Sequence, residues 1–152
     1  MWNPLDGLSS VKVAIKLLNY HAIIPTYGSE EAAGADLYSL VRLSIPPRET
    51  VAVSTGIAIQ LPKGFEAQCR SRSGMALNHS IFVLNSPGTI DSDYRGEIKV
   101  ILHNAGNETF YVDIEDRIAQ LVVVPVFRAS FDMVSELGHT DRGAGGFGST
   151  GA

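Results

Sequence analysis

The 152-residue sequence predicts an all-β domain, either a barrel or a sandwich, with one short helix. Three observations support this prediction. Short segments in which apolar and polar residues alternate follow one another along the chain, Pro and Gly turn signals separate them, and one segment alone has the composition of a helix. A chain of this length is expected to form a single domain, which we place at residues 1–152.

The N-terminal third is predicted to alternate loops with short strands. Residues 1–10 are rich in turn formers and are expected to form a loose lead-in. Residues 11–18 form an apolar run that predicts a first strand. Residues 21–34 are expected to be loop, and residues 35–43 resume a strand pattern that ends before two consecutive prolines.

The clearest strand pattern covers residues 51–61. One face carries Val51, Val53, Thr55, Ile57, Ile59 and Leu61. A period of two sustained over this length fits a strand and does not fit a helix. The turn at residues 62–64 ends the strand, and residues 65–70 are predicted to be its return strand.

Residues 71–79 differ from the rest because they contain no β-branched side chain. They predict the one short helix, with Ser73 as its N-cap. Beyond it, Pro87-Gly88 is a strong turn signal, and residues 98–103 alternate as a strand does. We expect a β-hairpin there, with two carboxylates, Asp91 and Asp93, near its bend.

The last predicted strands lie within residues 109–134, where a buried-looking run covers residues 121–124 and Pro125 marks an edge or a bend. From residue 138 onward the composition changes, since six of the last fifteen residues are Gly. Such a segment does not order itself by burial, so it is either a disordered tail or an arm that orders on a ligand. A phosphate-loop ATPase is excluded because no lysine precedes Ser149.

The overall composition excludes several classes of partner. A net charge of −4 argues against a nucleic-acid-binding protein. The only cysteine, Cys69, fits a reducing cytosol and is expected to be a buried structural thiol. No run approaches the length of a membrane span, so the protein is predicted to be soluble and cytoplasmic.

Several local patterns suggest phosphate chemistry, although each has an ordinary structural explanation. Arg72 and Ser73 at the start of the predicted helix could bind an anion, or could simply be a cap with a surface arginine. Gln120 in an apolar strand could contact a ligand or be a core amide. Asp91 could be a general base or a turn residue. Arg142 lies in a glycine-rich segment that suits phosphate oxygens.

The four histidines show no metal-ligand spacing, and no G-x-S-x-G motif is present. A protein-bound zinc and serine hydrolase chemistry are therefore not supported. Phosphate donors, a carboxylate base and a flexible lid together suggest nucleotide phosphate chemistry with a metal that the substrate brings.

The sequence resembles the homotrimeric deoxyuridine triphosphatase (dUTPase) family. The five ordered motifs of that family have counterparts in A-G-A-D-L-Y-S, R-S-G-M-A, N-S-P-G-T-I-D-S-D-Y-R-G, D-R-I-A-Q and R-G-A-G-G-F-G-S-T-G, at residues 33–39, 72–76, 85–96, 116–120 and 142–151. Ser71, where many members carry Pro, is a minor departure.

The resemblance implies a distorted jelly-roll β-barrel with a flexible glycine-rich C-terminal arm, residues 138–152, that closes as a lid. It implies a homotrimer with active sites shared between subunits. The implied reaction is the Mg²⁺-dependent hydrolysis of dUTP to dUMP and pyrophosphate by water attack on the α-phosphate. This reaction would limit uracil in DNA and supply dUMP for thymidylate synthesis.

The resemblance also implies residue roles. Asp91 would activate the attacking water, Tyr94 would lie against the deoxyribose, and Asp36 would support the water shell of Mg²⁺. Uracil would be recognised by Asn85, Gly88, Thr89, Ile90 and Lys99. Phosphate oxygens would be held by Arg72, Ser73, Gly74 and Gln120. In the arm, the γ-phosphate clamp and the ring that stacks on uracil would come from Arg142, Phe147, Gly148, Ser149 and Thr150.

Two alternatives stay open at this point. A dCTP deaminase, alone or bifunctional, is a relative on the same fold, but the complete fifth motif and the D-x-D-Y sequence argue against it. A non-catalytic relative could bind a nucleotide or a protein. The joint presence of five residues argues against that alternative, namely Asp91, Tyr94, Gln120, Arg142 and Phe147.

Overall fold

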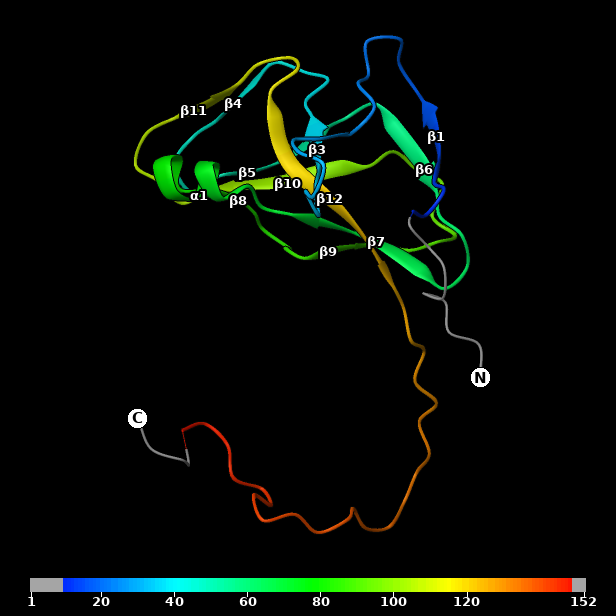
Figure 1. Ribbon diagram of the computed structural model, residues 1–152. Coiled ribbons are helices and arrows are strands. Elements are labelled where there is room, and N and C mark those ends of the chain that lie inside the picture. The colour runs from blue at the N-terminus through cyan, green and yellow to red at the C-terminus, as the bar shows by residue number, and fades with distance from the viewer. Residues whose placement is uncertain (1–9, 149–152) are drawn as a thin grey trace.

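The computed structural model describes residues 10–148, which form twelve strands and one short helix (Figure 1). The strands are β1 (Ala14–Leu17), β2 (Thr26–Tyr27), β3 (Ala35–Tyr38), β4 (Leu43–Ile45), β5 (Thr50–Ser54), β6 (Ile57–Gln60), β7 (Phe65–Arg70), β8 (Ile81–Val83), β9 (Gly88–Ile90), β10 (Lys99–Asn104), β11 (Phe110–Val112) and β12 (Arg117–Pro125). The helix, α1, is Ser73–His79. The predicted all-β class with one short helix is confirmed.

The strands pair in four antiparallel sheets. The largest has the order β2-β3-β12-β7-β9, and a three-stranded sheet has the order β5-β10-β8. Two further pairs are β1 with β6 and β4 with β11. This arrangement fits the jelly-roll class, although no closed barrel forms within residues 10–148.

One hydrophobic core lies between these sheets, and strands from all four contribute to it. Its fully buried side chains include Leu37, Ile45, Val53, Ile57, Ile81, Val83, Val100, Leu102, Val112 and Ile118. Full burial of a side chain of this size stabilises the fold by about 1.5–3 kcal/mol. The core therefore fixes the edges of the sheets, where the candidate site lies.

The predicted strand 51–61 is two strands, because the chain changes sheets at Gly56. The alternation itself is confirmed, since Val53, Ile57 and Ile59 are buried. Gly56 has a φ of +71°, and a Cβ there would lie 2.9 Å from both Ala22 and Leu40. Only glycine fits this close packing without strain. The break lets β5 pair with β10 while β6 pairs with β1.

Two predicted strand pairings are wrong. β7 does not return along β6 but lies between β12 and β9. β9 and β10 do not form a hairpin, since β9 pairs with β7 and β10 with β5 and β8. Alternation shows which face of a strand is buried but does not identify its neighbour. Residues 91–98 therefore connect two sheets.

The other strand boundaries differ in detail. The predicted strand 35–43 is divided into β3 and β4 by a turn, in which the Ser39 hydroxyl donates to the Val41 carbonyl at 2.7 Å. The predicted loop 21–34 contains the short β2, which pairs with β3. The predicted stretch 109–134 gives β11 and β12, and Pro125 is the last residue of β12. Residues 126–134 form no strand.

The helix α1 begins one residue earlier than predicted. Arg72, not Ser73, occupies the N-cap position, with extended backbone and no side-chain capping bond. Met75 is the one buried residue of the helix. A helix this short gains little from its own hydrogen bonds and is held by this contact and by the strands on either side.

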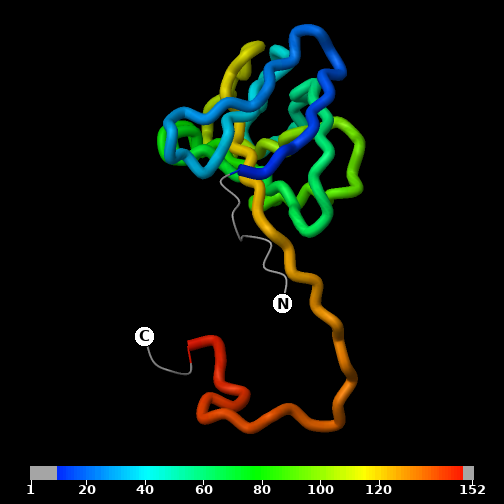
Figure 2. The backbone as a smooth tube through the Cα atoms, turned by 45° about the vertical axis from the view of Figure 1, so that its right-hand side comes forward, coloured from blue at the N-terminus to red at the C-terminus, as the bar shows by residue number. Residues whose placement is uncertain are grey.

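After β12 the chain leaves the folded body as an extended arm, which is described for residues 126–148 and contains the start of the glycine-rich segment predicted from residue 138 (Figures 1 and 2). No helix or strand is found in this described part of the arm. Several of its apolar side chains are exposed, namely Phe127, Phe131, Met133 and Leu137. Within residues 10–148, no helix is long and apolar enough to span a membrane.

Candidate functional site

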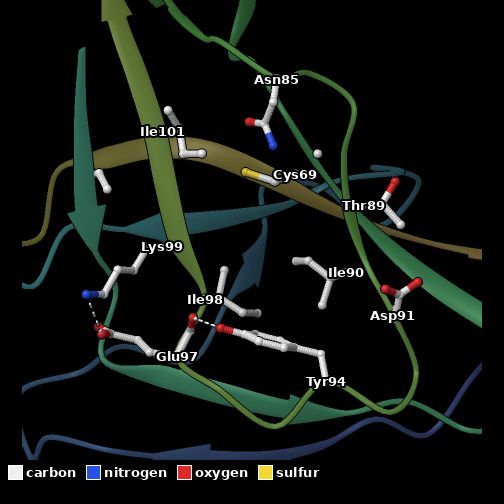
Figure 3. A pocket seen from close by; sticks show the side chains of 12 residues that line it. Cys69, Asn85, Thr89, Ile90, Asp91, Tyr94, Glu97, Ile98, Lys99 and Ile101 are labelled. Carbon is white, nitrogen blue, oxygen red and sulfur yellow. Dashed lines mark hydrogen bonds and ion pairs between the residues drawn. The ribbon is translucent and has the colours of Figure 1, made fainter.

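A pocket of about 620 Å³ opens between β9 and β10, and we call it the β9–β10 pocket (Figure 3). It is lined by Ala52, Cys69, Asn85, Gly88, Thr89, Ile90, Asp91, Tyr94, Glu97, Ile98, Lys99 and Ile101. The sequence predicted seven of these residues as contacts for uracil, sugar or the attacking water. The structure brings all seven together.

At one end of this pocket, a glycine makes room for an amide. The side-chain amide of Asn85 points into the hollow (Figure 3). A Cβ on the buried Gly88 would lie 2.9 Å from the Nδ2 atom of Asn85. A larger residue at position 88 would therefore displace the Asn85 amide from its place.

At the other end, Glu97 fastens the loop that carries Tyr94. The Tyr94 hydroxyl donates to the Glu97 carbonyl at 3.1 Å, and the Glu97 Oε1 atom accepts the Gly56 N–H at 2.9 Å. Its Oε2 atom lies 3.7 Å from the Nζ atom of Lys99. Sequence reasoning missed Glu97, because its anchor, Gly56, is distant in the chain.

Close packing against Tyr94 also requires a glycine. A Cβ on Gly96 would overlap the Tyr94 hydroxyl. The tyrosine side chain is partly exposed, and its ring lies across the lower end of the pocket (Figure 3). Part of the ring surface is thus available to a ligand.

Asp91 directly follows β9 and lies at the rim of the pocket (Figure 3). Its carbonyl accepts the Tyr94 N–H at 3.1 Å, which closes a turn. Its exposed carboxylate can therefore hold a water at the rim. Asp93 is exposed as well but does not line the pocket.

Cys69 forms part of the apolar wall of the β9–β10 pocket. It is 5% exposed, as predicted for a structural thiol, and pairs with Gly88 in the β7–β9 register. Burial raises the pKa of the Cys69 thiol to about 11. The thiol is therefore protonated at neutral pH and is a poor nucleophile.

A second, polar hollow of about 270 Å³ lies at the start of α1, and we call it the α1 hollow. It is lined by Arg72, Ser73, Gly74, Met75, Asn78, His79 and Gln120. The four predicted phosphate contacts are all among these residues. Gln120 is half-buried and packs over Gly34, where a Cβ would lie 3.1 Å from its own Cβ.

A buried carboxylate holds the arginine of the α1 hollow. The Asp36 side chain is 7% exposed, and its Oδ1 atom accepts a hydrogen bond from the Arg72 Nε at 3.2 Å. Its Oδ2 atom lies 3.5 Å from the Nη1 of Arg117. The Arg72 Nη1 also donates to the Arg117 carbonyl at 3.1 Å. Arg72 is thus fixed at two of its nitrogens.

The predicted arm residues that the structure describes, Arg142, Phe147 and Gly148, line neither hollow. The Arg142 Nε donates to the Gly145 carbonyl at 2.8 Å, within a local turn. Phe147 is fully exposed, and Gly148 follows it with a φ of +87°. Ser149 and Thr150 lie outside the described residues. In the described part of the chain, no three Cys, His, Asp or Glu side chains are placed to hold a metal.

Together, the fold and the two hollows define a jelly-roll protein with a small-molecule site at the edge of its sheets. The dUTPase family model matches residues 20–151. The chain belongs to the dUTPase family. The predicted family and the predicted class of enzyme, a nucleotidohydrolase, are confirmed.

Similar proteins agree with this assignment. The chain is 55% identical to a deoxyuridine 5'-triphosphate nucleotidohydrolase of Nautilia profundicola, over 93% of this chain and 99% of that one. It is 56% identical to the enzyme of that name from Wolinella succinogenes, over 97% of this chain and 99% of that one. A solved structure of the dUTPase of Staphylococcus bacteriophage 80alpha with dUpNHpp superposes with a TM-score of 0.86 at 25% sequence identity. The match covers 93% of this chain and 99% of that one.

Proposed function

We propose that this protein hydrolyses dUTP to dUMP and pyrophosphate. The observation that carries the proposal is the β9–β10 pocket, which combines the Asn85 amide, the backbone of β9, the Tyr94 ring and the Asp91 carboxylate. The family assignment supports the same reaction. Nothing in the pocket favours the alternative, a dCTP deaminase.

The recognition of uracil is proposed to use an unpaired strand edge. β9 is the last strand of its sheet and pairs on one side with β7. Its other edge can offer backbone N–H and C=O groups to a base, as it would to another strand. Uracil and cytosine present different donor and acceptor patterns, so fixed backbone groups and Asn85 can distinguish them. Close packing against β9 would exclude the methyl group of thymine.

Asp91 is proposed to be the general base. Its carboxylate would hold a water in line with the α-phosphorus and accept a proton as the water attacks. The new bond joins the water oxygen to the α-phosphorus, and the bond to the bridging oxygen breaks. Pyrophosphate leaves with the electrons of that bond, and the proton passes from Asp91 to solvent.

The hydrolysis is proposed to depend on Mg²⁺ that arrives with the triphosphate. Phosphate oxygens are the ligands this ion prefers, and when bound it would neutralise negative charge on the triphosphate. The predicted protein contact, Asp36, does not fit this role, because both of its oxygens face arginine side chains. We therefore assign no residue of this chain to the metal.

A homotrimer with shared sites is proposed because the site is divided within one chain. The β9–β10 pocket and the α1 hollow have no lining residue in common. The described part of the arm, residues 126–148, lines neither of them. Residues from neighbouring copies could complete the site, with residues 138–152 closing over it as a lid on the single domain 1–152. The supply of dUMP for thymidylate synthesis, the limitation of uracil in DNA and a cytoplasmic location stay predictions.

The experiment that tests the proposed function measures pyrophosphate release from dUTP, dCTP, dTTP and UTP in parallel, with and without Mg²⁺. Release from dUTP alone, dependent on Mg²⁺, is expected. An ammonia assay on dCTP runs beside it, and ammonia there would replace the proposal with a deaminase. No product from any nucleotide would indicate a binding protein.

A further inference from the structure

The α1 hollow has a feature that phosphate binding alone does not require, namely the buried carboxylate of Asp36 behind it. Asp36 comes from β3, whereas Arg72 follows β7 and Arg117 begins β12. Three strands thus bring one acidic and two basic side chains together. A buried charge is costly unless it is paired, and Asp36 is paired on both oxygens.

The contacts fix the plane of the Arg72 guanidinium group. Its Nε is bound to the Asp36 carboxylate and its Nη1 to the Arg117 carbonyl. Because the group is planar, two fixed nitrogens also set the direction of the third, Nη2. Among residues 10–148, Nη2 has no hydrogen-bond partner, and the Arg72 side chain is 26% exposed at the hollow.

The charges at this cluster favour an anion. Two guanidinium groups face a single carboxylate, so one positive charge is in excess beside the α1 hollow. An anionic ligand gains from this charge and from a charge-assisted bond to a fixed donor. A divalent cation near Asp36 would instead meet two guanidinium groups of like charge.

We propose that Asp36 is a positioning residue, which acts through Arg72 to hold one phosphate-binding donor in place, and that it does not support the metal's water shell. The proposal rests on the proposed function, since the phosphate is that of the nucleotide. It assigns to Asp36 an effect on ligand binding that is independent of the metal.

The test measures the binding of dUpNHpp to wild type and Asp36→Asn by calorimetry, in EDTA and in Mg²⁺. The substitution keeps the size of the side chain and removes its charge, so Arg72 loses its fixed position. We expect affinity to fall by about 10- to 100-fold, by the same factor in both conditions. The Mg²⁺ concentration that gives half-maximal dUTP turnover should not change.

Asp113→Asn is the matched control. Asp113 is also paired with an arginine, Arg42, but it is exposed and lies outside both hollows. This variant should bind dUpNHpp as wild type does. If Asp36→Asn does not fold, Asp36→Glu keeps the charge and displaces it by one methylene, and a smaller loss that is again independent of the metal is expected.

A double substitution shows whether Asp36 acts through Arg72. Adding Asp36→Asn to Arg72→Gln should weaken binding no further than Arg72→Gln alone. A shifted Mg²⁺ requirement with unchanged binding in EDTA would overturn the proposal, and so would unchanged behaviour in both assays. If wild type itself does not bind dUpNHpp, it is the proposed function that fails.

Discussion

The β9–β10 pocket and the C-terminal arm are both expected to contact the same nucleotide, yet the fold treats them differently. In the pocket, Tyr94 is hydrogen-bonded to Glu97, and Glu97 is hydrogen-bonded to Gly56, where the chain passes from β5 to β6. In the arm, Arg142 is bonded only within its own turn in the described residues. The proposed site of base recognition is therefore built into the folded chain, whereas the proposed phosphate clamp has to be ordered by something else.

The difference has a simple physical cause. The pocket residues lie on or between strands that the core holds, so their order is stabilised by buried apolar surface. The arm buries none of its large apolar side chains and is rich in glycine, which loses the most conformational entropy on ordering. A clamp of this kind closes only when a ligand or a neighbouring subunit offsets that cost.

The largest effect on turnover is expected when the proposed general base is removed and the pocket is left intact. Asp91→Asn is expected to lower kcat for dUTP by about 10²- to 10⁴-fold, because the water loses its base. Binding of dUpNHpp should stay within a few-fold of wild type, since Asp91 lies at the rim. Steady-state kinetics and calorimetry check the two quantities. A kcat within tenfold of wild type would remove Asp91 from its proposed role.

Removing the arm tests the other half of the comparison. A chain that ends at Gly138 is expected to lose about 100-fold in dUTP turnover, because the phosphates are no longer clamped. Its melting temperature should match that of wild type, since the arm contributes nothing to the core. Circular dichroism and pyrophosphate release measure both. Full turnover by the shortened chain would contradict the lid assignment.

A smaller effect is expected when the pocket itself is disturbed. Gly88→Ala places a methyl group against the Asn85 amide, so KM for dUTP should rise about tenfold, with little change in kcat. Gly28→Ala is the control, because no atom lies within 4 Å of a Cβ there. Equal KM values for the two variants would show that Asn85 does not depend on Gly88.

The smallest effect is expected at Cys69 and concerns stability. Burial raises the pKa of its thiol from 9.0 to about 11, so the folded protein keeps this proton to a higher pH than the unfolded chain. The stabilisation is present below pH 9 and is lost as the pH rises toward 11. Between pH 8 and 9.5, the loss should be roughly 1 kcal/mol. Urea unfolding of wild type and Cys69→Ala at both pH values isolates this contribution.

Much of the site could be predicted because it is continuous in sequence. Asn85, Asp91 and Tyr94 lie on one short segment, so a turn there brings them together whatever the sheet order. Alternation along residues 51–61 likewise identified the buried face correctly. These features depend on local geometry alone.

What could not be predicted depends on partners distant in the chain. The prediction that β9 and β10 form a hairpin was wrong, because apolar and polar residues alternate in the same way whichever strand lies beside them. The contact of Glu97 with Gly56 and the pairing of Asp36 with Arg72 arise only once the sheets have formed. The role of Ser73 as N-cap was wrong by one residue, within the usual uncertainty of helix ends.

The position of β12 has a consequence for synthesis. It is the last strand to be synthesised among residues 10–148, yet it lies at the centre of the five-stranded sheet, between β3 and β7. The growing chain therefore cannot complete this sheet until residue 125 has been added and has emerged from the ribosome. Until that point, β3 and β7 each have an open edge where β12 will lie, and an open strand edge can pair with another chain.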